Sequence, residues 1–283
     1  SAFQLGHVSV TVDTGTVVTR DGQGSGTMDI GDISVGQHIE AYGSFSAGGS
    51  GNSSLDATAG RVRLNYTHLF GTVGASAAGS LTLALQDIDG RDPARFNFAG
   101  TGAASASDAD PAHYVVSTGS LDISAAANGA YARLFGFVTP FGTAPPDFTA
   151  DTIVDFTSTR ASLGLTWGAV GAIAPFSASS TTALTLNLTG LHGLITLGAR
   201  PIDVSTLAIG LTLVPATGGT LVFAIAHRAS HAVSNYSTFA DFATQLSTEL
   251  NGTTAMYSLT AEGTFDAAGG VFTVQRLLVV LGD

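Results

Sequence analysis

The stretch that decides the fold is Leu259-Thr260-Ala261-Glu262-Gly263-Thr264-Phe265, followed by Asp266-Ala267-Ala268-Gly269-Gly270 and then Val271-Phe272-Thr273-Val274-Gln275-Arg276-Leu277. Apolar residues alternate with polar ones on both sides of a Gly-Gly corner, which is typical of a β-hairpin with one buried face. The region from Ala255 to Leu281 therefore predicts a strand, a tight turn and a second strand.

The same order of features occurs twice more, upstream of this stretch. Each copy has an alternating run that contains a glycine, then a glycine corner, and then a second alternating run. The first copy is Ile39–Phe45, Ala47–Gly49 and Thr58–Val62; the second is Ala132–Val138, Phe141–Gly142 and Phe148–Ile153. Three copies predict three related β-units, each closed by its own hairpin.

We therefore expect an all-β fold of two or three successive small antiparallel barrels or sandwiches, with one short amphipathic helix near the C-terminus. Residues 1–69 are expected to form a small β-barrel unit, residues 70–159 a second β unit, and residues 160–283 a larger third unit. The second unit includes residues 100–111, rich in Ala, Ser, Asp and Gly. Such a segment buries little apolar area, so we expect an exposed loop there.

The pattern also predicts individual elements. Residues 237–250 form the expected helix, with Ser237 or Thr238 as N-cap, an apolar stripe, and a stop at Asn251-Gly252. The apolar stripe consists of Phe239, Phe242, Ala243 and Leu246. Strands are expected, among others, at Val8–Val12, Thr16–Thr19, Thr27–Ile30, Gln37–Phe45, Ala57–Leu64, Leu81–Gln86, Ala161–Trp167, Thr182–Leu188, Leu194–Leu197, Leu207–Leu213 and Leu221–Ala226.

The charge composition narrows the classes of partner. Ten basic residues, all arginine, face 21 acidic ones for a net charge of −11, so a nucleic-acid backbone is not an expected partner. Lysine is absent, although it is a common residue for keeping edge strands apart. No run supplies the ~18 uninterrupted apolar residues of a membrane-spanning helix. The absence of cysteine excludes disulfides, thiolate metal sites and Cys-dependent catalysis.

The segment Ile33-Ser34-Val35-Gly36-Gln37-His38-Ile39-Glu40-Ala41-Tyr42-Gly43 resembles a motif of secreted bacterial domains of unknown function. In that family a Val-Gly-Asp-x-Val-x-Val-x-Gly-like strand precedes a glycine-rich hairpin and a closing strand. The resemblance implies small OB-like barrels repeated along envelope proteins and lipoproteins, and it implies no reaction. Gln37 stands where the family prefers Asp, and the second and third copies lack the Val-Gly lead-in.

Two groups of residues are candidate metal ligands. Asp87, Asp89 and Asp92 surround Gly90 at nearly alternate positions, a spacing by which loops present carboxylates to calcium, although Asp-Gly is also a common hairpin corner. His227 and His231 would share one face of a helix as zinc ligands do, but no third ligand can be named, and hydrogen-bonded histidines at a strand end are the plainer interpretation.

Catalytic motifs are not apparent: the sequence has no Gly-x-Ser-x-Gly elbow, phosphate loop or dinucleotide fingerprint. A hydrolase could use an acid and base from Asp122, Asp147 and Asp151, whose separation the sequence does not give. A glycan-binding module could use aromatic residues near the hairpins, whose alternative role is core packing. These aromatic residues are Tyr42, Tyr131, Phe135 and Phe141.

These observations favour a non-catalytic structural or assembly protein of the bacterial envelope or extracellular space. Its expected partner is itself or another envelope protein, through a β-edge or an apolar face, and no cofactor is expected apart from possible calcium. The run Leu277–Leu281 suits a strand buried on both faces, so its outward side chains need a cover, either the predicted helix or a partner subunit. A calcium- or glycan-binding module is the alternative, and a hydrolase is the third option.

Overall fold

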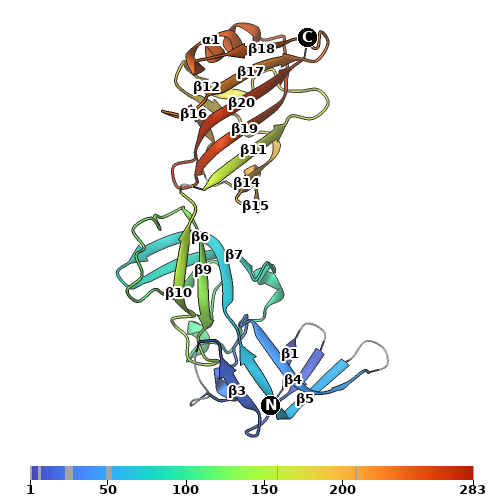
Figure 1. The fold of residues 1–283 in the computed structure, drawn as a ribbon, viewed down its shortest axis with the longest axis vertical. Helices are drawn as coiled ribbons and strands as arrows, with labels where there is room; N and C mark the ends of the chain where they lie inside the picture. The colour runs from blue at the N-terminus through green and yellow to red at the C-terminus, as the bar shows by residue number, and fades with distance from the viewer. Residues whose placement is uncertain are drawn as a thin grey trace. The chain divides into compact units, whose positions relative to one another are not determined.

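The computed structural model describes residues 2–5, 8–22, 28–48, 53–157, 159–207 and 209–282. Within these residues the chain consists mainly of strands with one α-helix near the C-terminus, which confirms the predicted all-β class. It divides into two compact units, Ser1–Asp155 and Phe156–Asp283 (Figure 1). The first unit contains two sheets and the second contains one.

The first sheet is built on one long central strand. This strand, β5 (Ser53–Leu64), pairs antiparallel with β4 (Ile39–Ser46) on one side. On its other side it pairs in parallel with β2 (Val8–Thr11) and then β3 (Val17–Arg20), and β1 (Ala2–Leu5) pairs antiparallel with β2. The buried side chains of this sheet are Val10, Val12, Val18, Ala57, Val62 and Leu64, joined by Phe137 from a later strand.

The structure describes residues 28–30 of the strand expected at Thr27–Ile30, and they do not form a strand, so this prediction is wrong. Residues from Ile30 to Asp32 form a short 3₁₀ helix, η1, because Asp29 and Asp32 cap each other's backbone. The Asp29 carboxylate accepts a hydrogen bond from the Gly31 N–H, and the Asp32 carboxylate accepts one from the Asp29 N–H. Such local bonds offer the backbone an alternative to a sheet. Thr27 lies outside the described residues, as do residues 49–52 at the first hairpin corner.

The second sheet is a closed five-stranded barrel in the order β10-β8-β7-β6-β9. Figure 1 labels four of these strands, β6, β7, β9 and β10. All neighbours pair antiparallel except β8 and β10, which are parallel. The interior is filled by fully buried residues such as Leu83, Leu134 and Phe148. The strands are β6 (Thr67–Ala77), β7 (Ser80–Ile88), β8 (Tyr114–Ser117), β9 (Tyr131–Val138) and β10 (Phe148–Asp155). Strand β6 carries residues from both sides of the boundary expected at residue 69.

Two 3₁₀ helices, η3 (Pro93–Arg95) and η4 (Ser105–Ser107), lie in the long connection between β7 and β8. Within the segment expected to be an exposed loop, most residues are exposed or half-buried, but Thr101 is buried. Its hydroxyl donates to the Phe98 carbonyl at 2.7 Å and accepts from the Ala109 N–H at 2.9 Å. The loop is therefore held by hydrogen bonds rather than by apolar burial.

The side-chain amide of Gln37 joins the first sheet to the barrel. Its Nε2 donates to the Asn65 carbonyl at 2.6 Å and to the His38 carbonyl at 3.0 Å. Its Oε1 accepts from the Val138 N–H, at the end of β9, at 2.9 Å. Gln37 is only 8% exposed, so these three bonds satisfy buried polar groups from three segments of the unit.

The second unit is a ten-stranded sheet in the order β12-β13-β16-β20-β19-β11-β14-β15, with β17 and β18 added beside β20. Strand β20 pairs antiparallel with β19 and, on its other side, in parallel with β16 and then β17. The strands are β11 (Arg160–Thr166), β12 (Phe176–Ser179), β13 (Leu184–Leu186), β14 (His192–Leu197), β15 (Arg200–Asp203), β16 (Thr212–Pro215), β17 (Val222–His227), β18 (Val233–Tyr236), β19 (Met256–Asp266) and β20 (Val271–Leu281).

The expected strand at Leu207–Leu213 starts later than predicted, at Thr212. Its predicted first half follows a 3₁₀ helix, η5 (Val204–Thr206), which the Asp203 carboxylate caps at the Ser205 N–H. Because this polar cap lies immediately before the apolar run, the strand begins at a later residue than the run does.

The single helix, α1 (Phe239–Glu249), lies within residues 237–250 as predicted. Thr238 is the N-cap, because its hydroxyl accepts a hydrogen bond from the Asp241 N–H at 3.1 Å. The predicted stripe is buried: its four residues are Phe239, Phe242, Ala243 and Leu246. The rings of Phe239 and Phe242 lie 5.5 Å and 5.9 Å from that of Phe223 on β17.

The three predicted hairpins are present as β4/β5, β9/β10 and β19/β20, and they share one backbone detail. Each has a register shift beside the glycine of its first strand, at Gly43, Gly136 and Gly263. A Cβ atom at any of these glycines would overlap a carbonyl oxygen of the partner strand, that of Asp56, Thr149 or Thr273. The repeated glycine therefore permits the close approach of two backbones at a β-bulge.

Candidate functional site

A concave surface lies on one face of the second unit's sheet. Five adjacent strands, β14, β11, β19, β20 and β17, line a groove of about 790 Å³. Small or neutral residues form much of its floor, among them Ser162, Gly164, Gly193, Thr260 and Ala224. Because so many side chains are short, the groove exposes sheet surface that larger residues would cover.

Three larger apolar residues of this groove remain exposed to solvent. Leu194 on β14 is 49% exposed, Val222 on β17 is 41% exposed, and Leu278 on β20 is 38% exposed. Their neighbours along each strand are buried: Ile195, Phe223, Leu277 and Val279. Because successive side chains of a strand point to opposite faces, the three exposed residues lie on the face away from the core. Exposed apolar side chains gathered in one groove are typical of an interaction site.

Helix α1 does not cover this face. Its rings contact Phe223, which is fully buried and pairs in register with the buried Leu277. Leu278 pairs with Ala224, the next register position, and so points to the other face of the sheet. The sequence predicted that either the helix or a partner subunit covers the outward side chains of Leu277–Leu281. The helix packs on the other face of the sheet, so it is not that cover.

A small charged cluster lies on the same face, and two of its members, Glu262 and Arg276, line the groove. Glu262 on β19 faces Arg160 on β11 and Arg276 on β20, with its Oε2 at 3.0 Å and 3.3 Å from their guanidinium nitrogens. All three side chains are well exposed, so the pairs contribute little to stability. Together these three side chains carry one more positive than negative charge.

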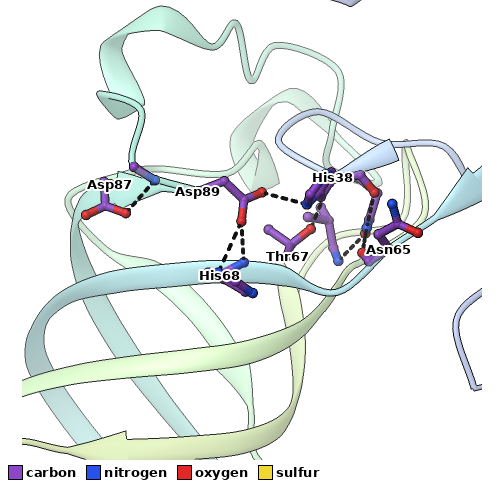
Figure 2. A network of polar contacts seen from close by, with 9 residues as sticks. His38, Asn65, Thr67, His68, Asp87 and Asp89 are labelled. Carbon is purple, nitrogen blue, oxygen red and sulfur yellow. Dashed lines mark hydrogen bonds and ion pairs between the residues drawn. The ribbon is translucent and has the colours of Figure 1, made fainter. Parts of the chain in front are cut away.

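Among the residues that the structure describes, Asp87, Asp89 and Asp92 do not converge as a set of metal ligands. Figure 2 shows two of them, Asp87 and Asp89. Asp87 is buried and its Oδ1 accepts from the Gly90 N–H at 2.9 Å. Asp92 accepts from the Ala94 N–H at 2.9 Å and so caps η3. Each of these carboxylates thus binds a local backbone donor, which makes the segment a hydrogen-bonded turn.

Asp89, the third residue of that loop, lies between two histidines (Figure 2). It adopts a left-handed conformation with φ of 50°, and its Oδ1 accepts from the His68 backbone N–H at 2.9 Å. The Nδ1 atoms of His38 and His68 are each 3.7 Å from one oxygen of its carboxylate. Asp89 thus links the start of β4 to β6, which positions the first sheet on the barrel. No local spacing in the sequence pairs these two histidines, so their contact with Asp89 is set by the fold.

The histidines proposed as zinc ligands have separate environments. His227 ends β17, and its Nε2 lies 3.3 Å from the Oε2 of Glu249, the last residue of α1. His231 is exposed in the β17–β18 turn, with φ of 55°. Among the residues that the structure describes, no group of three or more His, Cys, Asp or Glu side chains is placed to hold a metal ion.

The candidate hydrolase carboxyls also differ in environment. Asp122 is exposed and accepts from the Ser124 N–H at 2.9 Å, which lowers the pKa of its carboxyl. Asp151 is exposed at the bulge of β10. Asp147 is only 5% exposed, beside the buried Tyr114, and it accepts from the Val115 N–H at 2.7 Å. Burial raises the pKa of Asp147 despite that hydrogen bond, and the nearby Asp110 raises it further.

We expect the Asp147→Asn variant to be more stable than the wild type at pH 7. A carboxyl whose pKa is raised by folding contributes its stability below its unfolded pKa, about 3.9, and loses it as the pH rises through the folded pKa. Asparagine keeps an acceptor for the Val115 N–H without a charge. The stability advantage of the Asp147→Asn variant over the wild type, measured by urea unfolding, should therefore decrease as the pH is lowered from 7 to 4.

Asp122→Asn is the matched control, because folding lowers the pKa of that exposed carboxyl. Its removal should give no gain in stability at pH 7. A stability difference for Asp147→Asn that stays constant across this pH range would contradict the assignment of the raised pKa to this residue.

The four aromatic residues proposed for glycan binding fall into two groups. Tyr42 and Phe141 are about half exposed, at 55% and 47%. Tyr131 is 6% exposed and stacks on Phe70 with ring centroids 5.5 Å apart, and Phe135 packs its edge against His68 at 4.6 Å. Two of the four thus take part in packing, the alternative role considered for them.

Comparison of the chain with protein-family models, with curated proteins and with solved structures found no match. In the described part of the chain, no helix combines the length and apolar character needed to cross a membrane. Inference about function therefore depends on the groove, the strand edges and the charge composition.

Proposed function

We propose that the protein is a non-catalytic structural or assembly protein of the bacterial cell envelope or extracellular space, which acts through protein–protein contacts. The observation that carries this proposal is the open groove of the second unit, with Leu194, Val222 and Leu278 exposed and α1 packed on the opposite face of the sheet. A second copy of the chain is the partner that we favour, because a face built largely of short side chains allows two sheets to approach closely.

The composition of the chain supports the same role. Edge strands and apolar faces are ordinarily kept apart by long charged side chains, and only 11% of this chain is charged, with no lysine. The closed barrel has the strand order of an OB-fold, which supports the resemblance to repeated domains of secreted envelope proteins. Proteins with an OB-fold have many unrelated functions. The strand order therefore supports the proposed location in the envelope or extracellular space more than it supports any particular activity.

We expect the wild-type protein to form oligomers whose population rises with protein concentration and changes little with salt, because apolar contacts are not screened. The Leu278→Lys variant should weaken this association by at least about tenfold, or ~1.4 kcal/mol, since it places a charge in the contact. Light scattering and sedimentation over a range of concentrations measure both effects.

Val170→Lys is the control, because Val170 is an exposed apolar residue of the same unit, at 82%, that does not line the groove. It should leave the association unchanged. A wild-type protein that stays monomeric at high concentration would refute the proposal of self-assembly, and calcium-dependent melting would instead favour the alternative of a calcium-binding module.

A further inference from the structure

The groove crosses strands that lie side by side in the second unit, β14, β11, β19, β20 and β17 (Figure 1). At its centre, Gly164 on β11 pairs with Leu194 on β14 and with Thr260 on β19. Thr260 pairs with Leu278 on β20, which is in register with Ala224 on β17. Residues in register on neighbouring strands point to the same face of a sheet. These five residues therefore form one row across the groove, which we call the central row.

The side chains of the central row differ in size on the two sides of Thr260. The residues on the strands next to β19 are Gly164 on one side and Leu278 on the other. One strand further out they are Leu194 and Ala224. A Cβ atom built on Gly164 would meet no described atom within 4 Å, so the space above it is open. At each distance from β19, a large residue on one side thus corresponds to a small one on the other.

The neighbouring row has the same asymmetry on the strands next to β19. In that row Glu262 on β19 pairs with Ser162 on β11 and with Arg276 on β20. The short Ser162 and the long Arg276 are therefore equally far from β19. Both rows thus carry short side chains on β11 and long ones on β20, and this pattern would be complementary to itself after a rotation of 180° about β19.

We propose that the groove is one half of a two-fold symmetric sandwich, in which a second copy of the chain packs face to face with the symmetry axis along β19. This inference rests on the proposed assembly role and specifies its contact. The axis sets β20 of one copy against β11 of the other, and β17 against β14. Leu278 then enters the open space above Gly164 of the second copy, while Leu194 packs on its Ala224. Each of these contacts occurs twice, as in any isologous interface.

Other positions of the two-fold axis fit the central row less well. An axis between β11 and β19 would set Leu194 against Leu278 of the second copy, and the space above Gly164 would stay unfilled. An axis along the central row would set each residue opposite itself, so that leucine meets leucine and glycine meets glycine. Packed sheets interdigitate their side chains at high density, which favours the axis that sets large residues against small ones.

The charged cluster is compatible with an axis along β19. Glu262 approaches Glu262 of the second copy, but each carboxylate already lies between Arg160 and Arg276 of its own chain. Arg276 faces Ser162 of the second copy and not another arginine. The charges that meet at the axis are therefore compensated within each chain, which limits the cost of bringing like charges together.

An exchange of sizes tests the contact between Leu278 and Gly164 of the second copy. Gly164→Leu should weaken dimer formation by at least about tenfold, because the new side chain occupies the space that Leu278 fills. Leu278→Ala should also weaken it, because that space stays empty. The variant with both substitutions should associate within about threefold of the wild type, since the large residue has moved to the other side of the same contact. Sedimentation over a range of concentrations measures the dissociation constants, and circular dichroism checks that each variant folds.

Single cysteine variants test the position of the axis, because the chain has no cysteine of its own. The two copies of Thr260 face each other across the axis, at about the 10 Å spacing of packed sheets. A bismaleimide of that reach should therefore join Thr260→Cys into a covalent dimer. Thr196→Cys is the control, because Thr196 lies on β14, two strands from β19, which separates its two copies by about 20 Å.

Two results would overturn this inference and leave the assembly role standing. One is a double variant that associates no better than the weaker single variant, although the wild type forms oligomers that Leu278→Lys disrupts. The other is equal cross-linking of Thr260→Cys and Thr196→Cys in such oligomers. A wild-type chain that stays monomeric at high concentration would refute the two-fold contact together with the assembly role.

Discussion

The Gly263→Ala variant should lower the stability of the second unit by about 3 kcal/mol, since a side chain is forced into a packed backbone contact. A Cβ atom at this position would overlap the carbonyl oxygen of Thr273 on the partner strand. That atom belongs to the backbone of β20, so relief requires the strand to move rather than a side chain to rotate. The expected decrease in melting temperature is about 10 °C, measured by far-UV circular dichroism.

Gly164→Ala is the matched control in the neighbouring strand, β11. A Cβ atom there would have no atom within 4 Å, so the substitution should be neutral or stabilise the unit by about 0.5 kcal/mol. Equal destabilisation by the two substitutions would show that the loss at Gly263 comes from general strand preferences and not from the close approach. Gly43 and Gly136, which face the carbonyls of Asp56 and Thr149, should behave as Gly263 does.

The Gln37→Glu variant should lower the stability of the first unit by about 3 kcal/mol at pH 7. The wild-type amide donates to the carbonyls of Asn65 and His38 and accepts from the Val138 N–H. A carboxylate keeps the acceptor but brings a second oxygen against two carbonyl oxygens in a buried site. Urea unfolding of the variant, compared with the wild type, measures the loss.

The penalty at position 37 should decrease with acidification. Burial and the two carbonyls disfavour the charged carboxylate, so folding raises its pKa, and the loss of stability should develop as the pH rises above about 4.3. Gln4→Glu is the control, because Gln4 is exposed on β1 of the same sheet. A Gln37→Glu variant as stable as Gln4→Glu at pH 7 would contradict the role of the amide in joining sheet and barrel.

The side chain at position 37 must both donate and accept hydrogen bonds. An ionised Asp or Glu side chain can only accept them. The amide of Gln37 accepts from the Val138 N–H and also donates to two carbonyls, so it suits a junction that needs both functions.

The candidate metal sites show why spacing alone is a weak guide to ligands. Asp87, Asp89 and Asp92 have a spacing typical of calcium loops, yet two of them cap nearby backbone N–H groups. Asp89 instead meets His38 and His68, which lie far from it in the sequence. Local hydrogen bonding of Asp is available at any turn, so it competes with ligand geometry wherever such a spacing occurs.

The sequence by itself determined the class of fold, the three hairpins and the helix, because each depends on the spacing of apolar residues, glycines and caps within one short segment. The tertiary structure decided which surfaces stay open. Whether Leu278 is covered, for example, depends on the face on which α1 packs. Pairings such as that of Gln37 with Val138, 101 residues apart, are set by the packing of whole sheets, about which local alternation carries no information.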